Sequence, residues 1–182
     1  MPRSTWREIG ETARALIIAI LVALFIRAFV VETFQVHGIS MQPNLQNGER
    51  LLVNKFQYRV STPQIGQIII FHPPQIAACP EVGPHPDDYV KRVIALAGET
   101  VSLSNGSVYV DGKLQPEPYL PLSWRSGNFA PYTVPAGDVW VLGDHRAVSL
   151  DSRCYGPIAL SRIVGRVMLI WWPFNKAQWL GW

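Results

Sequence analysis

The first chemical candidate is a serine in the segment Gly38-Ile39-Ser40-Met41-Gln42-Pro43-Asn44-Leu45. Ser40 follows a β-rich stretch and lies between Gly38 and Pro43, so a strand is expected to give way to a turn there. Such a turn exposes a hydroxyl group, but serine beside glycine and proline is also a common turn former. Ser40 therefore needs a base elsewhere in the chain before it is interpreted as a nucleophile.

A candidate base is Lys91, inside the alternating stretch Tyr89–Leu96. Strand geometry places Lys91 on the face that carries Tyr89, Val93 and Ala95. Burial among apolar groups lowers the pKa of a lysine from about 10.4, because the charged form loses its hydration, and the neutral amine can then act as a general base. The alternative is an exposed Lys91 that pairs with Asp87 or Asp88.

A third segment, residues 142–153, is a dense polar loop between two β-rich stretches. Its polar members include Asp144, His145, Ser149, Asp151 and Arg153. His145 beside Asp144 also raises the alternative of a Ser-His-Asp triad with Ser40. Adjacent residues rarely orient one another in a triad, so the serine and lysine pair is favoured.

Taken in chain order, these segments resemble the bacterial type I signal peptidases. That family has a membrane anchor, a serine in S-M-x-P-T-L, a lysine in Y-V-K-R and a loop of the form G-D-N-R-x-x-S-x-D-S-R. The resemblance extends from an apolar N-terminal segment, residues 15–31, to about Val167.

The resemblance implies Ser40 as the nucleophile, Lys91 as the general base, and Ser149 as a second hydroxyl that orients the lysine amine. The Ser40 backbone N–H would contribute to an oxyanion hole. Charged braces of the site would be Asp144, Asp151, Arg92 and Arg153. Shallow pockets for small substrate side chains would be lined by Val36, Met41, Leu45 and Tyr89.

The sequence departs from the family pattern at several positions. Asn44 replaces the usual threonine, Ala97 a frequent proline and His145 the usual asparagine, while Val148 stands at an often polar position. None of these removes the nucleophile or the base. Gly38 stands where some members have a serine that helps to bind the oxyanion, so a second donor is not assigned.

An apolar segment at residues 15–31, ALIIAILVALFIRAFVV, precedes the serine. It has the length and composition of a slightly short membrane-spanning helix. Arg3, Arg7 and Arg14 precede it, so the positive-inside rule places residues 1–14 in the cytoplasm and residues 32–182 outside as a catalytic domain. A cleaved signal peptide is the alternative, but no small-residue cleavage site follows the segment.

Short β-rich runs dominate the rest of the chain. They predict strands at Phe34–Val36, Arg50–Tyr58, Gln67–His72, Tyr89–Leu96, Thr100–Leu103, Ser107–Val110, Asp138–Leu142 and Ile163–Trp171. Asn105-Gly106 and Asp111-Gly112 predict tight hairpin turns, whereas Gln75–Asp88 and Gln115–Pro135 are expected to be irregular excursions. The predicted fold is mainly β: an antiparallel, barrel-like sheet domain preceded by one transmembrane helix.

Composition narrows the function. Charged residues are only 16% of the chain and the net charge is +3 without a basic run, which argues against a disordered chain and a nucleic-acid partner. Neither cysteine has the spacing of a metal site, so no metal or cofactor is expected. Cys79 and Cys154 are either joined in a disulfide, if exported, or two separate thiols.

Tryptophans cluster in the last residues of the chain: Trp171, Trp172, Trp179 and Trp182. They are expected either at a lipid surface or in the core.

Together with the apolar segment, the resemblance implies a single-pass membrane serine endopeptidase that removes signal peptides from exported preproteins after small residues. Its expected partners are preproteins and the phospholipid bilayer, in a plasma membrane or an internal membrane such as a thylakoid. The alternatives are a related peptidase dedicated to one exported substrate and a non-cutting adaptor that binds exported chains.

Overall fold

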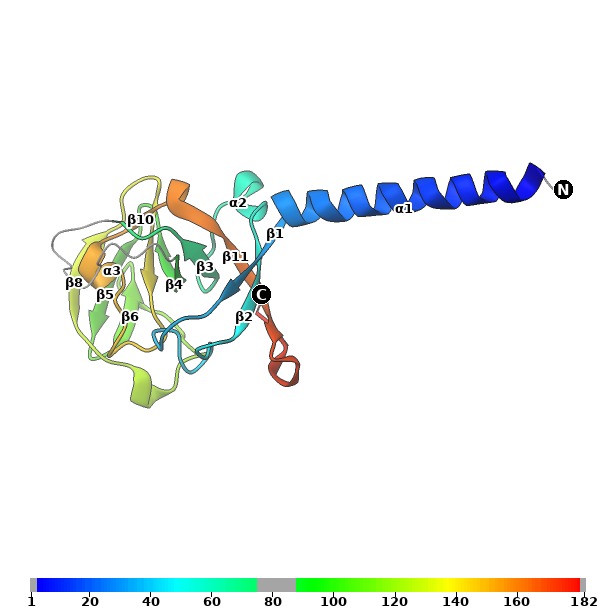
Figure 1. The fold of residues 1–182 in the computed structure, drawn as a ribbon. Coiled ribbons are helices and arrows are strands. Elements are labelled where there is room, and N and C mark those ends of the chain that lie inside the picture. The colour runs from blue at the N-terminus through cyan, green and yellow to red at the C-terminus, as the bar shows by residue number, and fades with distance from the viewer. Residues whose placement is uncertain (1–2, 75–87, 181–182) are drawn as a thin grey trace.

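The computed structural model describes residues 3–74 and 88–180 of the chain. Helix α1 (Arg3–Phe29) extends away from a β-rich body (Figure 1). It begins before the predicted segment 15–31 and ends earlier, because Val31 already pairs in strand β1 (Val31–Gln35). No helix within the described residues is both long and apolar enough to cross a membrane. The large apolar side chains of α1 between Leu16 and Phe25 are exposed.

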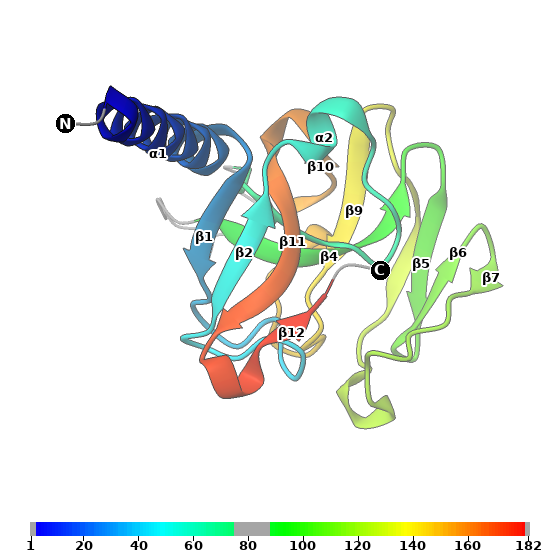
Figure 2. The ribbon, with the colours of Figure 1, turned by 90° about the vertical axis from the view of Figure 1, so that its right-hand side faces the viewer.

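Two antiparallel sheets form the body (Figure 2). The larger is curled and has the order β1-β2-β11-β3-β4-β9-β10, with β12 paired to β11. Its further strands are β2 (Arg50–Asn54), β3 (Ile68–Phe71), β4 (Tyr89–Leu96), β9 (Asp138–Leu142), β10 (Ile158–Ala159), β11 (Ile163–Trp172) and β12 (Gln178–Trp179). The smaller has the order β7-β6-β5-β8, from β5 (Thr100–Ser104), β6 (Ser107–Val110), β7 (Lys113–Leu114) and β8 (Phe129–Thr133). The predicted mainly β, antiparallel fold is confirmed.

The two predicted hairpin turns join the strands of the smaller sheet. Asn105 and Gly106 connect β5 to β6 with φ angles of 48° and 76°, and Asp111 and Gly112 connect β6 to β7 with 50° and 72°. Positive φ at both central residues gives the turn a twist that matches the strands, and asparagine, aspartate and glycine tolerate it best. Both turn predictions are therefore confirmed.

Other elements differ from the predictions. The strand predicted at Arg50–Tyr58 ends at Asn54, whose side-chain oxygen accepts from the backbone N–H groups of Phe56 and Gln57 and begins helix α2 (Gln57–Val60). The region predicted as irregular at Gln115–Pro135 contains β8, because pairing with β5 overrides a proline-rich local sequence. The other predicted excursion, residues 75–88, lies almost wholly outside the described residues. Short helices α3 (Ser152–Tyr155), η1 (Leu122–Trp124), η2 (Leu160–Arg162) and η3 (Phe174–Lys176) complete the described elements.

Strand β4 passes between three apolar clusters and carries Lys91 near its beginning. Val93 packs in one cluster with Ile69 and Val141. The predicted alternation fails beyond Val93, because a bulge against β9 moves Ala95 to the cluster that also holds Ile94. Because the bulge comes after Val93, the residues Tyr89, Lys91 and Val93 keep the predicted alternation.

Candidate active site

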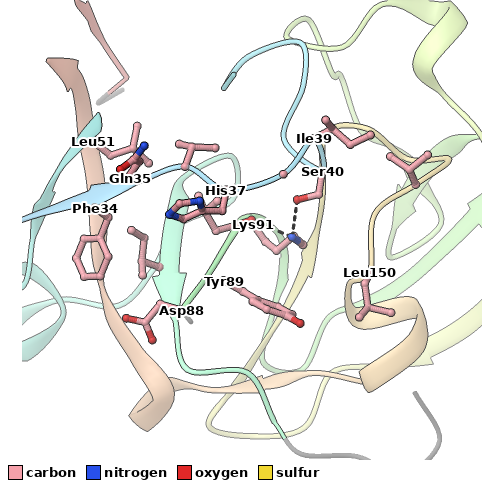
Figure 3. A pocket seen from close by; sticks show the side chains of 15 residues that line it. Phe34, Gln35, His37, Ile39, Ser40, Leu51, Asp88, Tyr89, Lys91 and Leu150 are labelled. Atoms are coloured by element: carbon pink, nitrogen blue, oxygen red, sulfur yellow. Dashed lines mark hydrogen bonds between the residues drawn. The ribbon is translucent and has the colours of Figure 1, made fainter. Parts of the chain in front are cut away.

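Ser40 and Lys91 meet although 51 residues separate them in the sequence. Lys91 Nζ donates a hydrogen bond of 2.8 Å to Ser40 Oγ, and another of 3.1 Å to the carbonyl oxygen of Val90. Figure 3 shows the two side chains pointing toward one another from β4 and from the turn after β1. A nucleophile and a base within hydrogen-bond reach are the minimal requirement for activating a hydroxyl.

Lys91 is buried, with 4% of its surface exposed. It lies in β4 opposite Ile69 of β3, and β9 pairs with the other side of β4. Burial lowers the pKa of Lys91 from 10.5 to about 8, against the opposing effects of the Asp151 and Asp144 carboxylates. The neutral amine is thus accessible near physiological pH.

The alternative of an exposed Lys91 paired with an acidic neighbour does not describe this site. Asp88 instead contacts His72, with 2.5 Å between its Oδ1 and the ring Nδ1. Asp87 lies outside the described residues.

Ser40 is held by a turn whose backbone closes on itself. The N–H of Gln42 donates to the Ile39 carbonyl, and the N–H of Leu45 to the Met41 carbonyl. Gly38 enters the turn with φ of 88°, a conformation that suits glycine. Ser40 itself is fixed from outside the turn, because its carbonyl oxygen accepts from the His145 backbone N–H at 2.9 Å.

Asp144 pairs with Arg92 as expected for a brace. Arg92 Nε and Nη2 donate to the two Asp144 carboxylate oxygens at 2.8 and 2.7 Å, and both side chains are buried. Because Arg92 follows Lys91 in β4, this pair joins the lysine strand to the loop that contains Ser149. A bidentate geometry fixes orientation as well as distance.

Asp151 and Arg153 form the second expected pair. Arg153 Nε donates to Asp151 Oδ1 at 2.8 Å, and Asp151 Oδ2 also accepts from the Gly143 backbone N–H at 3.0 Å. Asp151 additionally precedes α3 as its N-cap, accepting from the Arg153 backbone N–H. The loop is therefore closed by one fully buried carboxylate.

Ser149 lies in this loop, and its predicted contact with Lys91 is not formed. Its buried Oγ makes no hydrogen bond to any group in the described parts of the chain. The Ser149 backbone N–H donates to the His145 carbonyl, which keeps the residue beside the Ser40 turn. The orienting role of Ser149 remains a prediction.

A groove of about 240 Å³ opens beside Ser40 and Lys91 (Figure 3). Two of the four residues predicted to bind substrate, Val36 and Tyr89, line it. The other two, Met41 and Leu45, do not; they are buried in an apolar cluster with Leu51 and Val53. The turn directs these side chains inward, so they support the groove from behind.

Sequence reasoning missed a second buried ion pair. Arg146 donates to the Glu117 carboxylate from both terminal nitrogens, and both side chains are almost fully buried. Tyr119 donates from its hydroxyl to Glu117 at 3.0 Å. No local pattern distinguishes Glu117 within the region predicted as irregular. Arg146 lies in the polar loop, but the sequence assigns it no role.

The alternative triad has no support in the geometry. The His145 ring lies 4.1 Å from the Trp124 ring, between centroids, and its Nδ1 is buried without a hydrogen-bond partner among the described residues. Asp144 is paired with Arg92 instead.

Cys154 is disulfide-bonded, and the other cysteine of the chain, Cys79, lies outside the described residues. Across residues 3–74 and 88–180, no cluster of His, Cys, Asp or Glu is placed to hold a metal ion.

The family described as "Signal peptidase, peptidase S26" matches residues 9–172. "Probable signal peptidase I-1" of Synechocystis sp. is 38% identical over 98% of this chain and 90% of its own length. "Signal peptidase IB" of Staphylococcus aureus is 34% identical over 93% of both chains. A crystal structure of a signal peptidase I from Enterococcus faecalis is 30% identical, with a TM-score of 0.48 over 59% of this chain and 97% of that one. The chain is a member of the signal peptidase family of serine peptidases.

Proposed function

We propose that this signal peptidase cleaves exported preproteins with Ser40 as its nucleophile and Lys91 as its general base. The single observation that carries the proposal is the 2.8 Å contact between Lys91 Nζ and Ser40 Oγ, made by a lysine whose pKa burial lowers to about 8. An activated serine needs such a neighbouring base.

In the proposed reaction, neutral Lys91 takes the Ser40 hydroxyl proton while Oγ bonds to the carbonyl carbon of the scissile peptide. The resulting oxyanion accepts a hydrogen bond from the Ser40 backbone N–H. The carbon–nitrogen bond then breaks as the Lys91 ammonium returns its proton to the leaving amine, which gives an acyl-enzyme. Lys91 then takes a proton from a water molecule as the water oxygen attacks the ester carbonyl. The bond from the acyl carbon to Oγ breaks as Lys91 returns that proton to Oγ, which releases the signal peptide and regenerates Ser40.

Ser149 is proposed to orient the Lys91 amine. Its buried hydroxyl is held near Ser40, since the Ser149 N–H and the Ser40 carbonyl both bind the main chain of His145. The two ion pairs, Asp144 with Arg92 and Asp151 with Arg153, are proposed to brace the loop around the base.

The groove supports a preference for small side chains at the cleavage site. About 240 Å³ is a small volume for a ligand pocket, and apolar side chains contribute much of its lining. Val36 and Tyr89 are proposed as substrate contacts, whereas Met41 and Leu45 are proposed to act only by shaping its floor.

We further propose that residues 15–31 anchor the chain in the plasma membrane, or in an internal membrane such as a thylakoid. The exposed apolar side chains of α1 support this, because they have no protein surface to cover them. Exposed Trp172, Phe174 and Trp179, on the turn from β11 to β12, support contact of the body with lipid headgroups. A reporter enzyme fused after Trp182 tests the topology, and it should be active only outside the cytoplasm.

Cleavage of several unrelated preproteins by the full chain in detergent micelles tests the enzymatic proposal. Wild type should cleave all of them after a small residue, whereas Ser40→Ala should leave them intact. Ser161→Ala, at an exposed serine of η2, is the matched control and should cleave as wild type does. Turnover by Ser40→Ala near that of Ser161→Ala would refute the nucleophile, and cleavage of one preprotein alone would indicate a dedicated processor.

A further inference from the structure

Asn44 contacts two distant parts of the chain through one amide nitrogen. Asn44 Nδ2 donates a hydrogen bond of 2.8 Å to Asp144 Oδ2 and another of 3.0 Å to the carbonyl oxygen of Tyr119. A side-chain amide carries two N–H donors, so both bonds are formed at once. Asn44 belongs to the turn that begins at Ser40, and its partners lie 100 and 75 residues further along the chain.

The Asp144 acceptor is held independently of Asn44. Its carboxylate takes both donors of the Arg92 fork, and no part of its side chain is exposed. Arg92 is adjacent to Lys91 in β4, and its remaining terminal nitrogen donates to the Gly66 carbonyl at 2.8 Å. The Asn44 bond to Asp144 therefore connects the serine turn to the strand that carries the proposed base.

The Tyr119 acceptor is also held independently. The Arg92 guanidinium lies 3.8 Å from the centre of the Tyr119 ring, and the Tyr119 hydroxyl donates to the buried carboxylate of Glu117. Glu117 pairs in turn with Arg146. Both acceptors of Asn44 are thus held next to buried charged groups by contacts that do not involve the Asn44 amide.

We propose that Asn44 is a positioning residue that sets the Ser40 hydroxyl against Lys91 by means of both N–H donors. This inference rests on the proposed roles of Ser40 and Lys91. Asn44 does not line the groove beside Ser40; it lines a separate cavity of about 740 Å³ together with Arg92 and Tyr119. Its loss should therefore lower kcat with little change in KM.

The number of donors gives a graded test. Asn44→Leu removes both donors at similar volume, and Asn44→Thr keeps one hydroxyl donor that can serve only one acceptor. The matched control is Gln46→Leu, because the Gln46 amide lies in the same region but, among the described residues, bonds only to Pro43 and Gln42. Full-length wild type and the three variants are assayed on one preprotein for kcat and KM, with Ser40→Ala alongside and unfolding temperatures measured.

We expect kcat to fall ~100-fold in Asn44→Leu and ~10-fold in Asn44→Thr at nearly constant KM, since small misplacements of reacting groups have effects of this size. Gln46→Leu should keep kcat within about twofold of wild type. Should Asn44→Leu not fold, Asn44→Thr decides by the same division between kcat and KM.

Three results would overturn the inference: wild-type kcat in Asn44→Thr, a loss confined to KM, or equal losses in Asn44→Leu and Gln46→Leu. Failure of the underlying function gives a different result, because wild type would then not cleave or Ser40→Ala would cleave equally well.

Discussion

Gly143 and Ser149 approach so closely that no side chain fits between them. A Cβ atom on Gly143 would lie 2.1 Å from Ser149 Oγ and 2.6 Å from the carbonyl oxygen of Ser40. Rotation of the Ser149 hydroxyl would not relieve the clash, because Ser149 Cβ would also lie 2.5 Å away, and the Ser40 oxygen belongs to the backbone of the turn that carries the proposed nucleophile. Glycine at residue 143 therefore allows the polar loop to pack closely against the turn that carries Ser40.

Gly143→Ala should consequently displace the Ser40 turn and lower preprotein cleavage by about 100-fold or more, because a shift near 1 Å has effects of that order. Steady-state cleavage kinetics provide the measurement. Gly10→Ala is the control, since a Cβ there meets nothing within 4 Å. Equal activity of the two variants would show that the loop absorbs the methyl group.

Lys91→Met should change how stability depends on pH. In the folded protein the pKa of Lys91 is lowered from 10.5 to about 8, whereas the unfolded chain keeps its proton up to the ordinary value. Between these values the unfolded state binds more protons, so the free energy of unfolding rises with pH. Below about pH 8 the wild type must bury a charged amine.

Urea denaturation across this pH range measures the effect. Relative to wild type, Lys91→Met should lose part of the rise between about pH 8 and 10.5 and be more stable at neutral pH. Lys113→Met, at an exposed lysine of β7, should leave the profile unchanged. Identical profiles for the two variants would contradict a lowered pKa.

Glu117→Gln should destabilise the protein by about 3–5 kcal/mol, because it leaves the buried Arg146 guanidinium without its counter-charge. The double variant Glu117→Leu with Arg146→Met removes both charges and should be less destabilised than the single one. Glu32→Gln, which breaks a partly exposed pair with Lys55, should cost no more than about 1 kcal/mol. Chemical denaturation curves compare all three, and similar losses from the buried and exposed pairs would be inconsistent with this assignment.

Ser149→Ala should separate activity from stability. The hydroxyl is buried without a partner among the described residues, so its removal should not lower the unfolding temperature. If it orients the neutral amine during the reaction, cleavage should fall by about tenfold, the value of one hydrogen bond. Unchanged cleavage would remove Ser149 from the mechanism.

The fold was predictable wherever the signal was local. Asn105-Gly106 and Asp111-Gly112 specify their turns through backbone conformation alone, and β4, β6 and β9 follow from short apolar runs. Strand β8 was not predictable, because Pro131 interrupts it and the region around it is rich in proline, so it becomes a strand only through pairing with β5. The end of β2 at Asn54 likewise depends on hydrogen bonds from the Phe56 and Gln57 backbone N–H groups to the Asn54 side chain, which the β-rich composition does not reveal.

Some residues of the candidate site were predictable from the sequence, and others were not. Ser40 and Lys91 were predicted from residue pattern and resemblance together, and the two loop carboxylates from the resemblance. The structure brings Ser40 and Lys91 into contact and pairs each carboxylate with an arginine. Met41 and Leu45 matched a motif, but the motif does not say which side of the turn they occupy. Glu117 and Tyr119 come from a separate excursion, and only the tertiary structure brings them to the loop.

The most direct test of the central claim is kcat/KM for preprotein cleavage as a function of pH, in wild type and in Lys91→Arg. A general base must be neutral, so wild-type activity should rise with pH through an apparent pKa of about 8 and then level off. Lys91→Arg cannot deprotonate in this range and should be inactive at every pH. Substantial activity in Lys91→Arg with the wild-type pH profile would contradict Lys91 as the base.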